Sequence, residues 1–75
     1  MHFDEELDVR GLLCPLPILK TRFRMDTMAE GEILKVISTD AGSVRDMEAF
    51  ARQTENELLA STAEGEEYVF HLRKG

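Results

Sequence analysis

The apolar segment from Ile33 to Ile37 most constrains how this 75-residue chain can fold. It is rich in β-branched residues and predicts a strand over residues 32–40. An amphipathic segment lies on each side of it, and a short alternating segment, residues 6–10, precedes the first of these. A strand, a helix and a second strand in this order favour parallel pairing through a right-handed crossover. The first half of the chain is therefore expected to form a β–α–β unit.

The second half of the chain predicts one more helix and a hairpin. Apolar residues recur at helical spacing over residues 43–54, and Asn56 is expected to end this helix in a left-handed conformation. Segments 57–63 and 68–73 alternate as strands do and are separated by a turn at Gly65. The element order is βαβαββ. We expect an α/β two-layer sandwich, with a mixed four-stranded sheet and both helices on one face.

The motif Cys-Pro-Leu-Pro at residues 14–17 holds the only cysteine, and Gly11 stands three positions before it. Proline is tolerated in the first turn of a helix, because its missing N–H would have no partner there. A helix is thus expected to begin near Pro15 and to end near Ala29. Free N–H groups and the helix dipole favour negative charge at a helix start. The pKa of the Cys14 thiol is therefore expected to lie below that of a free thiol.

A single cysteine limits the chemistry that the chain can perform. Cys14 can form no internal disulfide, no multi-cysteine metal site and no dithiol redox pair. A Cys–His couple would need His2 or His71, and neither is expected beside the motif. Asp40 and Asp46 are expected to cap the second helix or close the turn before it. What remains is a sulfur nucleophile suited to carrying an adduct from one protein to another, unless Cys14 is merely a small buried hydrophobe.

The predicted first helix carries two apolar stripes on opposite sides. The longer stripe is expected to face the core and consists of Ile18, Met25, Met28 and Ala29. The shorter one is expected to stay exposed beside the cysteine as a docking surface, and consists of Leu16, Leu19 and Phe23. An equally weighted alternative folds Phe23 back onto the edge of the sheet.

Three basic residues follow the cysteine closely: Lys20, Arg22 and Arg24. They form either a strip that steers anionic partners or a solvated helix face. The chain as a whole carries a formal net charge of −6, which opposes direct binding to nucleic acid. No metal or cofactor is expected.

The composition also favours a compartment. No apolar run approaches the roughly 20 residues needed to span a bilayer. Residues Met1 to Glu6 are polar and acidic and do not resemble a secretory signal. With one unpaired cysteine, the expected location is the reducing cytoplasm.

Five groups of residues together resemble the TusA/SirA family of small sulfur-carrier proteins. They are Leu7-Asp8 with Gly11-Leu12 and the Cys14–Pro17 motif; Met28 with Gly31-Glu32; Asp40; Arg45-Asp46 with Phe50; and Glu57-Leu58 with the ending Leu72-Arg73-Lys74-Gly75. The resemblance implies one domain over residues 1–75 with a two-layer βαβαββ fold, the same fold as the periodicities predict.

The resemblance also implies a function, a sulfurtransferase relay centred on Cys14. The cysteine would accept sulfane sulfur from a cysteine desulfurase or a rhodanese, hold it as a persulfide, and pass it to a cysteine of a DsrE-like acceptor protein. Gly11, Pro15 and Pro17 match the motif residues that support the loop and the helix start. Arg22 matches a basic position that would contact partners. The pathway would be either 2-thiouridine formation in tRNA or sulfur oxidation.

Two other functions compete with the relay. The chain could be a non-enzymatic regulatory or adaptor domain that binds a partner protein through its first helix. It could also be a small RNA-binding domain, since sheets with helices on one face often bind RNA. The absence of a basic surface and an aromatic content of 7% disfavour RNA binding.

Overall fold

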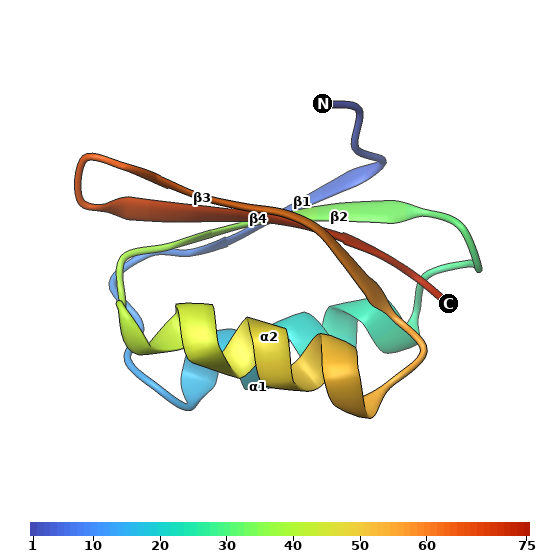
Figure 1. The fold of residues 1–75 in the computed structure, drawn as a ribbon, viewed down its shortest axis with the longest axis horizontal. Coiled ribbons are helices and arrows are strands. Elements are labelled where there is room, and N and C mark those ends of the chain that lie inside the picture. Colours follow the sequence, from blue (N-terminus) through green and yellow to red (C-terminus); the bar gives the residue numbers. More distant parts are fainter.

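The computed structural model describes residues 1–75 and shows a sheet covered on one face by two helices, with the open face on the other side (Figure 1). The elements in chain order are β1 (Glu5–Val9), α1 (Leu16–Asp26), β2 (Ile33–Ser38), α2 (Gly42–Gln53), β3 (Glu57–Glu64) and β4 (Glu67–Arg73). The predicted βαβαββ order and the two-layer α/β sandwich are confirmed.

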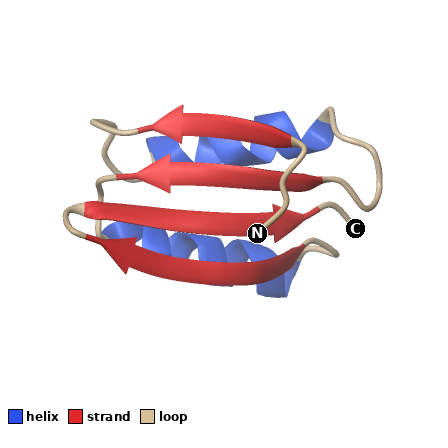
Figure 2. Cartoon of the chain, turned by 90° about the horizontal axis from the view of Figure 1, so that it is seen from above, coloured by secondary structure: helices blue, strands red, loops and turns tan.

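The strands lie in the order β1-β2-β4-β3, with β1 and β2 parallel and the other pairs antiparallel (Figure 2). Val9 pairs with Ser38 and Ser38 pairs with Tyr68, so the ends of β1 and β2 and the β3–β4 turn lie at the same end of the sheet. Both helices start there (Figure 1). We call it the motif end, because the loop with the Cys-Pro-Leu-Pro motif lies at it. Gly65, with φ of 63°, forms the hairpin turn with Glu66.

The core fills the space between the sheet and the helices. In β2, half-buried and buried residues alternate along the strand, as the pleat of a sheet with one covered face requires. The buried apolar cluster consists of Val9, Met25, Met28, Leu34, Val36, Met47, Phe50, Phe70 and Leu72. On the helix side, Thr21 is also fully buried, and its hydroxyl donates to the carbonyl of Pro17 at 2.8 Å. Met25 and Met28 confirm the longer stripe as the core face, whereas Ala29 is exposed.

Helix α1 ends at Asp26, three residues before the predicted end at Ala29. At this end the carbonyl of Arg24 accepts both the Thr27 hydroxyl at 2.7 Å and the Thr27 backbone N–H at 3.1 Å. Met28 is buried even though it lies beyond the helix. The periodicity therefore predicted the buried side correctly, but it overestimated the length of the helix.

Helix α2 ends at Gln53, and the prediction that Asn56 ends it in a left-handed conformation is wrong. The chain leaves the helix through an extended Thr54, whose hydroxyl donates to the carbonyl of Phe50 at 2.7 Å. The side-chain carbonyl of Asn56 instead accepts the N–H of Gly75 at 3.0 Å. Its polar side chain thus ties the C-terminus to the loop after α2.

The N-terminal residues lie over the open face of the sheet. The rings of Phe3 and His71 are 6.3 Å apart, and the Lys35 ammonium lies 5.2 Å from the centre of the Phe3 ring. Burial lowers the pKa of His71, and the positive charges of the N-terminus and Lys35 act in the same direction. Neither helix has the length and apolar character that crossing a membrane requires.

Candidate functional site

Cys14 lies in the loop between β1 and α1, and its side chain is exposed at the motif end. The loop turns at Gly11, whose φ of 81° is a conformation that glycine adopts without steric cost. The Gly11 N–H donates to the Thr39 hydroxyl at 2.9 Å. This bond ties the loop after β1 to the loop after β2. The Cys14–Pro15 peptide bond is cis.

The two motif prolines hold the start of α1. Pro15 is the residue before the first helical position, as predicted within one residue. Pro17 lies in the first turn, where its missing N–H leaves no partner unsatisfied. Its ring is fully buried. Pro17 therefore anchors the motif to the core, while Cys14 stays at the surface.

Asp40 joins the cysteine loop to the start of α2. One carboxylate oxygen accepts the backbone N–H of Cys14 at 2.8 Å, and the other accepts that of Gly42 at 3.3 Å. The main-chain carbonyl of Asp40 also accepts the N–H of Ser43 at 3.0 Å and its hydroxyl at 2.6 Å. The predicted turn role of Asp40 is confirmed, and its bond to Cys14 was not predicted. No side chain caps α2, whose N-cap residue is Ala41, so the capping role predicted for Asp46 is wrong.

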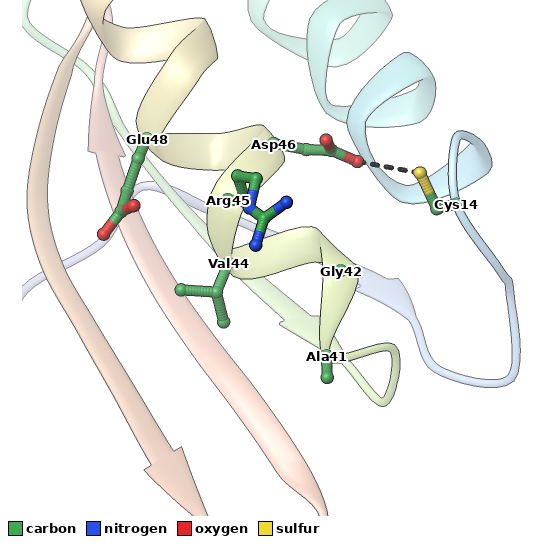
Figure 3. Close-up of a pocket in the computed structure, with 7 residues that line it drawn as sticks. All are labelled: Cys14, Ala41, Gly42, Val44, Arg45, Asp46 and Glu48. Atoms are coloured by element: carbon green, nitrogen blue, oxygen red, sulfur yellow. Dashed lines mark hydrogen bonds between the residues drawn. The ribbon is translucent and has the colours of Figure 1, made fainter.

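Asp46 points from the first turns of α2 at the sulfur of Cys14 (Figure 3). The thiol Sγ–H donates to the Asp46 Oδ2 at a distance of 3.0 Å. This hydrogen bond raises the pKa of the Cys14 thiol, since it stabilises the protonated form beside a carboxylate. Desolvation of the thiol by neighbouring groups and the charges of Asp46 and Asp40 act in the same direction. The predicted lowering of the Cys14 pKa is therefore wrong, because the Asp46 hydrogen bond and the charges of the two carboxylates favour the protonated thiol.

Neither histidine pairs with the cysteine. His2 lies at the N-terminus and bonds the carboxylate of Asp4 at 3.1 Å. His71 is in β4 beside Phe3, on the open face of the sheet. Neither histidine lies beside the motif, as predicted, whereas the contact of Asp46 with the sulfur was not predicted.

Two shallow hollows meet at Cys14. The first has a volume of about 580 Å³ and is lined by Cys14, Ala41, Gly42, Val44, Arg45, Asp46 and Glu48 (Figure 3). The second lies along the helices and is lined by Cys14, Pro15, Ile18, Arg22, Asp46, Ala49, Phe50 and Gln53. The Arg22 guanidinium lies 5.4 Å from the centre of the Phe50 ring in this second hollow. The sulfur is thus reachable from two sides of the same end.

The shorter apolar stripe of α1 stays exposed, as predicted. The exposed fractions are 45% for Leu16, 39% for Leu19 and 67% for Phe23. The alternative in which Phe23 packs on the sheet edge is therefore wrong.

The three basic residues of α1 do not form one strip. Arg24 reaches the Glu5 carboxylate of β1 at 3.3 Å, whereas Arg22 turns toward α2 and the Phe50 ring. Lys20 is exposed. Of the predicted partner-binding residues, Arg22 shares a hollow with Cys14, and the other four lie on the outer side of α1.

Comparison with known proteins places this arrangement in a family. The family model described as "Sulfurtransferase TusA" matches residues 5–74. The chain is 51% identical over 72 residues to the sulfur carrier protein TusA of Allochromatium vinosum, covering 96% of this chain and 95% of the relative. It is 39% identical to the putative sulfur carrier protein YrkI of Bacillus subtilis over the full length of both chains. It is 49% identical to the putative sulfur carrier protein YrkF of the same organism, over 92% of this chain and 37% of that longer relative. The chain therefore belongs to the TusA family of sulfur carrier proteins.

Proposed function

We propose that this chain acts as one carrier domain that holds sulfane sulfur as a persulfide on Cys14. The observation that carries the proposal is the placement of the only cysteine, exposed where two hollows meet, on a chain of a sulfur-carrier family. The side chain that is hydrogen-bonded to the sulfur is the carboxylate of Asp46. Since no second cysteine is present, a sulfur bound to Cys14 cannot be released by an internal disulfide.

The proposed reaction moves one sulfur atom between thiols. In loading, the Cys14 Sγ attacks the terminal sulfur of a donor persulfide; the Sγ–S bond forms and the sulfur–sulfur bond of the donor breaks. The sulfur that stays on the donor leaves with the bonding electron pair and takes up the proton lost from Cys14. Unloading is the same exchange, with an acceptor thiol as the attacking group. Both steps balance without an outside oxidant or reductant.

Other proteins complete this reaction, so the chain is a sulfurtransferase in a relay rather than an enzyme that turns over alone. We propose a cysteine desulfurase or a rhodanese as the donor and a DsrE-like protein as the acceptor. The surface proposed to dock them consists of Leu16, Leu19, Lys20, Arg22 and Phe23. Three of these are apolar and exposed, which is typical of a surface that partners cover.

The relay would serve either 2-thiouridine formation in tRNA or sulfur oxidation. The net charge of −6 favours transfer between proteins over a direct grip on tRNA in either pathway.

Loading is tested by incubating the reduced protein with a cysteine desulfurase and cysteine and measuring its intact mass. We expect one added sulfur atom on the wild-type chain, removed by a reductant, and none on the Cys14→Ser variant. A variant with an unchanged thiol, Phe23→Ser, serves as a control for folding and should still accept sulfur from a small persulfide. A wild-type chain that stays unmodified under conditions that load another TusA protein would refute the proposal.

A further inference from the structure

The contact between Cys14 and Asp46 has different consequences for the empty and the loaded carrier. In the empty state the Sγ–H donates to the Asp46 Oδ2 at 3.0 Å (Figure 3). In a persulfide the Sγ is bonded to carbon and to the second sulfur, so it has no hydrogen left to donate. The bond seen in the structure therefore belongs to the empty state alone.

The loaded state also places a second negative charge beside the Asp46 carboxylate. A sulfur–sulfur bond is about 2 Å long, so the terminal sulfur of the persulfide stays within a few ångströms of Asp46. An anionic terminal sulfur there is repelled by the Asp46 carboxylate and, more weakly, by Asp40, whose charge is offset by two N–H donors. Two cations line the hollows that meet at Cys14, Arg45 in the first and Arg22 in the second, and neither forms an ion pair with Asp40 or Asp46.

We propose that Asp46 biases Cys14 toward giving up its sulfur, by stabilising the empty thiol through its hydrogen bond and destabilising the persulfide anion at the same place. This inference rests on the proposed function and adds to it a residue that sets the sulfur affinity of the carrier. The raised pKa of the Cys14 thiol agrees with the first half of the argument. A carrier of this kind holds sulfur loosely and favours delivery to an acceptor without such a carboxylate.

The bias is measured as an equilibrium, which avoids the separate effects that a carboxylate has on forward and reverse rates. The protein is equilibrated with glutathione persulfide and glutathione at a fixed ratio, and intact mass gives the loaded and empty fractions. The reaction is Cys14–SH plus GS–SH giving Cys14–S–SH plus GSH. Both effects of Asp46 oppose loading, so the Asp46→Asn variant should shift the equilibrium toward the persulfide by about fivefold, as expected for one charge at about 4 Å in water.

The matched control is Glu48→Gln, which removes the same charge from the same helix. The Glu48 side chain points away from the Cys14 sulfur and is not bonded to it (Figure 3). Asp46→Ala is a second test variant that removes the charge with a good helix former. The thiol pKa of each variant, followed by thiolate absorbance, reports the hydrogen bond independently of sulfur transfer.

The outcomes separate this inference from the proposed function. A shift toward the persulfide and a lower thiol pKa in both Asp46 variants, with Glu48→Gln near wild type, supports the inference. If all variants load to the wild-type extent, or if Glu48→Gln shifts the equilibrium as much as Asp46→Asn does, the bias is refuted and the carrier function stands. If not even the wild-type chain takes up sulfur, the proposed function itself fails.

Discussion

Replacing Asp40 by alanine should destabilise the chain and loosen the loop that holds Cys14. The Asp40 carboxylate accepts two backbone N–H groups, from Cys14 at 2.8 Å and from Gly42 at 3.3 Å. In Asp40→Ala both donors lose their partner, and the link between the β1–α1 loop and the start of α2 is broken. The hydrogen bonds of the Asp40 main chain to Ser43 are unaffected, so the turn itself is expected to persist.

The magnitude follows from the type and the exposure of these bonds. Removing a side chain that accepts backbone N–H groups near a helix start typically costs about 1 kcal/mol, within a range of about 0.5–2 kcal/mol. Asp40 is half-buried, so water can reach part of the site and replace some of the lost bonding. We expect the free energy of unfolding to fall by about 1–2 kcal/mol. For a domain of this size, each kcal/mol lowers the Tm by about 4–8 °C.

The assay is urea denaturation followed by circular dichroism, with the same measurement on two other variants. Asp40→Asn keeps one acceptor oxygen and should lose about half as much stability. Glu30→Ala removes an exposed carboxylate that accepts no hydrogen bond and should stay within about 0.5 kcal/mol of wild type. If Asp40→Ala unfolds at the same urea concentration as Glu30→Ala, the two hydrogen bonds of the Asp40 carboxylate contribute nothing to stability and the reasoning is wrong.

Three other perturbations give separate tests. The Arg10 side chain and backbone N–H lower the pKa of Asp8 to about 2. This carboxylate therefore contributes stability above the pKa of an unfolded aspartate, about 4, and the contribution is lost as the pH falls toward 2. Asp8→Asn should flatten this acid dependence of the Tm, and an unchanged slope contradicts the prediction. Phe70→Ala empties a fully buried position and should cost about 3–5 kcal/mol in urea denaturation, whereas a loss below about 1 kcal/mol would mean that the core is not packed as described. Phe23→Ser should leave the Tm near wild type, because the side chain is 67% exposed. The same variant should be loaded more slowly by a cysteine desulfurase, and an unchanged loading rate would mean that Phe23 is not part of the docking surface.

The order of the elements and the fold class were predictable from the sequence, because the spacing of apolar residues within each element distinguishes a strand from a helix. The alternation in β2 and the helical spacing of Met47 and Phe50 each identify a buried face without knowledge of the rest of the chain. The ends of the helices were less predictable. Helix α1 ends where the side chain and the backbone N–H of Thr27 both bond the Arg24 carbonyl, and apolar spacing does not report such contacts.

The position of Cys14 was predictable, and its surroundings were not. The prolines of the motif mark a helix start from local rules alone. Asp46 is 32 residues away in the sequence, and its contact with the sulfur depends on how α2 lies beside α1. The local sequence shows the positive end of α1 and so predicts a lowered thiol pKa, whereas α2 and the turn before it bring two carboxylates to the same place and raise this pKa.

The most direct test of the carrier function follows one sulfur atom from this chain to an acceptor. Wild-type protein loaded by a cysteine desulfurase is freed of the donor and mixed with a purified DsrE-like protein, and the intact masses of both proteins are followed in the same sample. We predict that Cys14 loses one sulfur atom as the acceptor gains one, and that Cys14→Ser protein treated in the same way transfers none. A loaded chain that keeps its sulfur in the presence of acceptor thiols, or a Cys14→Ser chain that still delivers sulfur, would contradict the account.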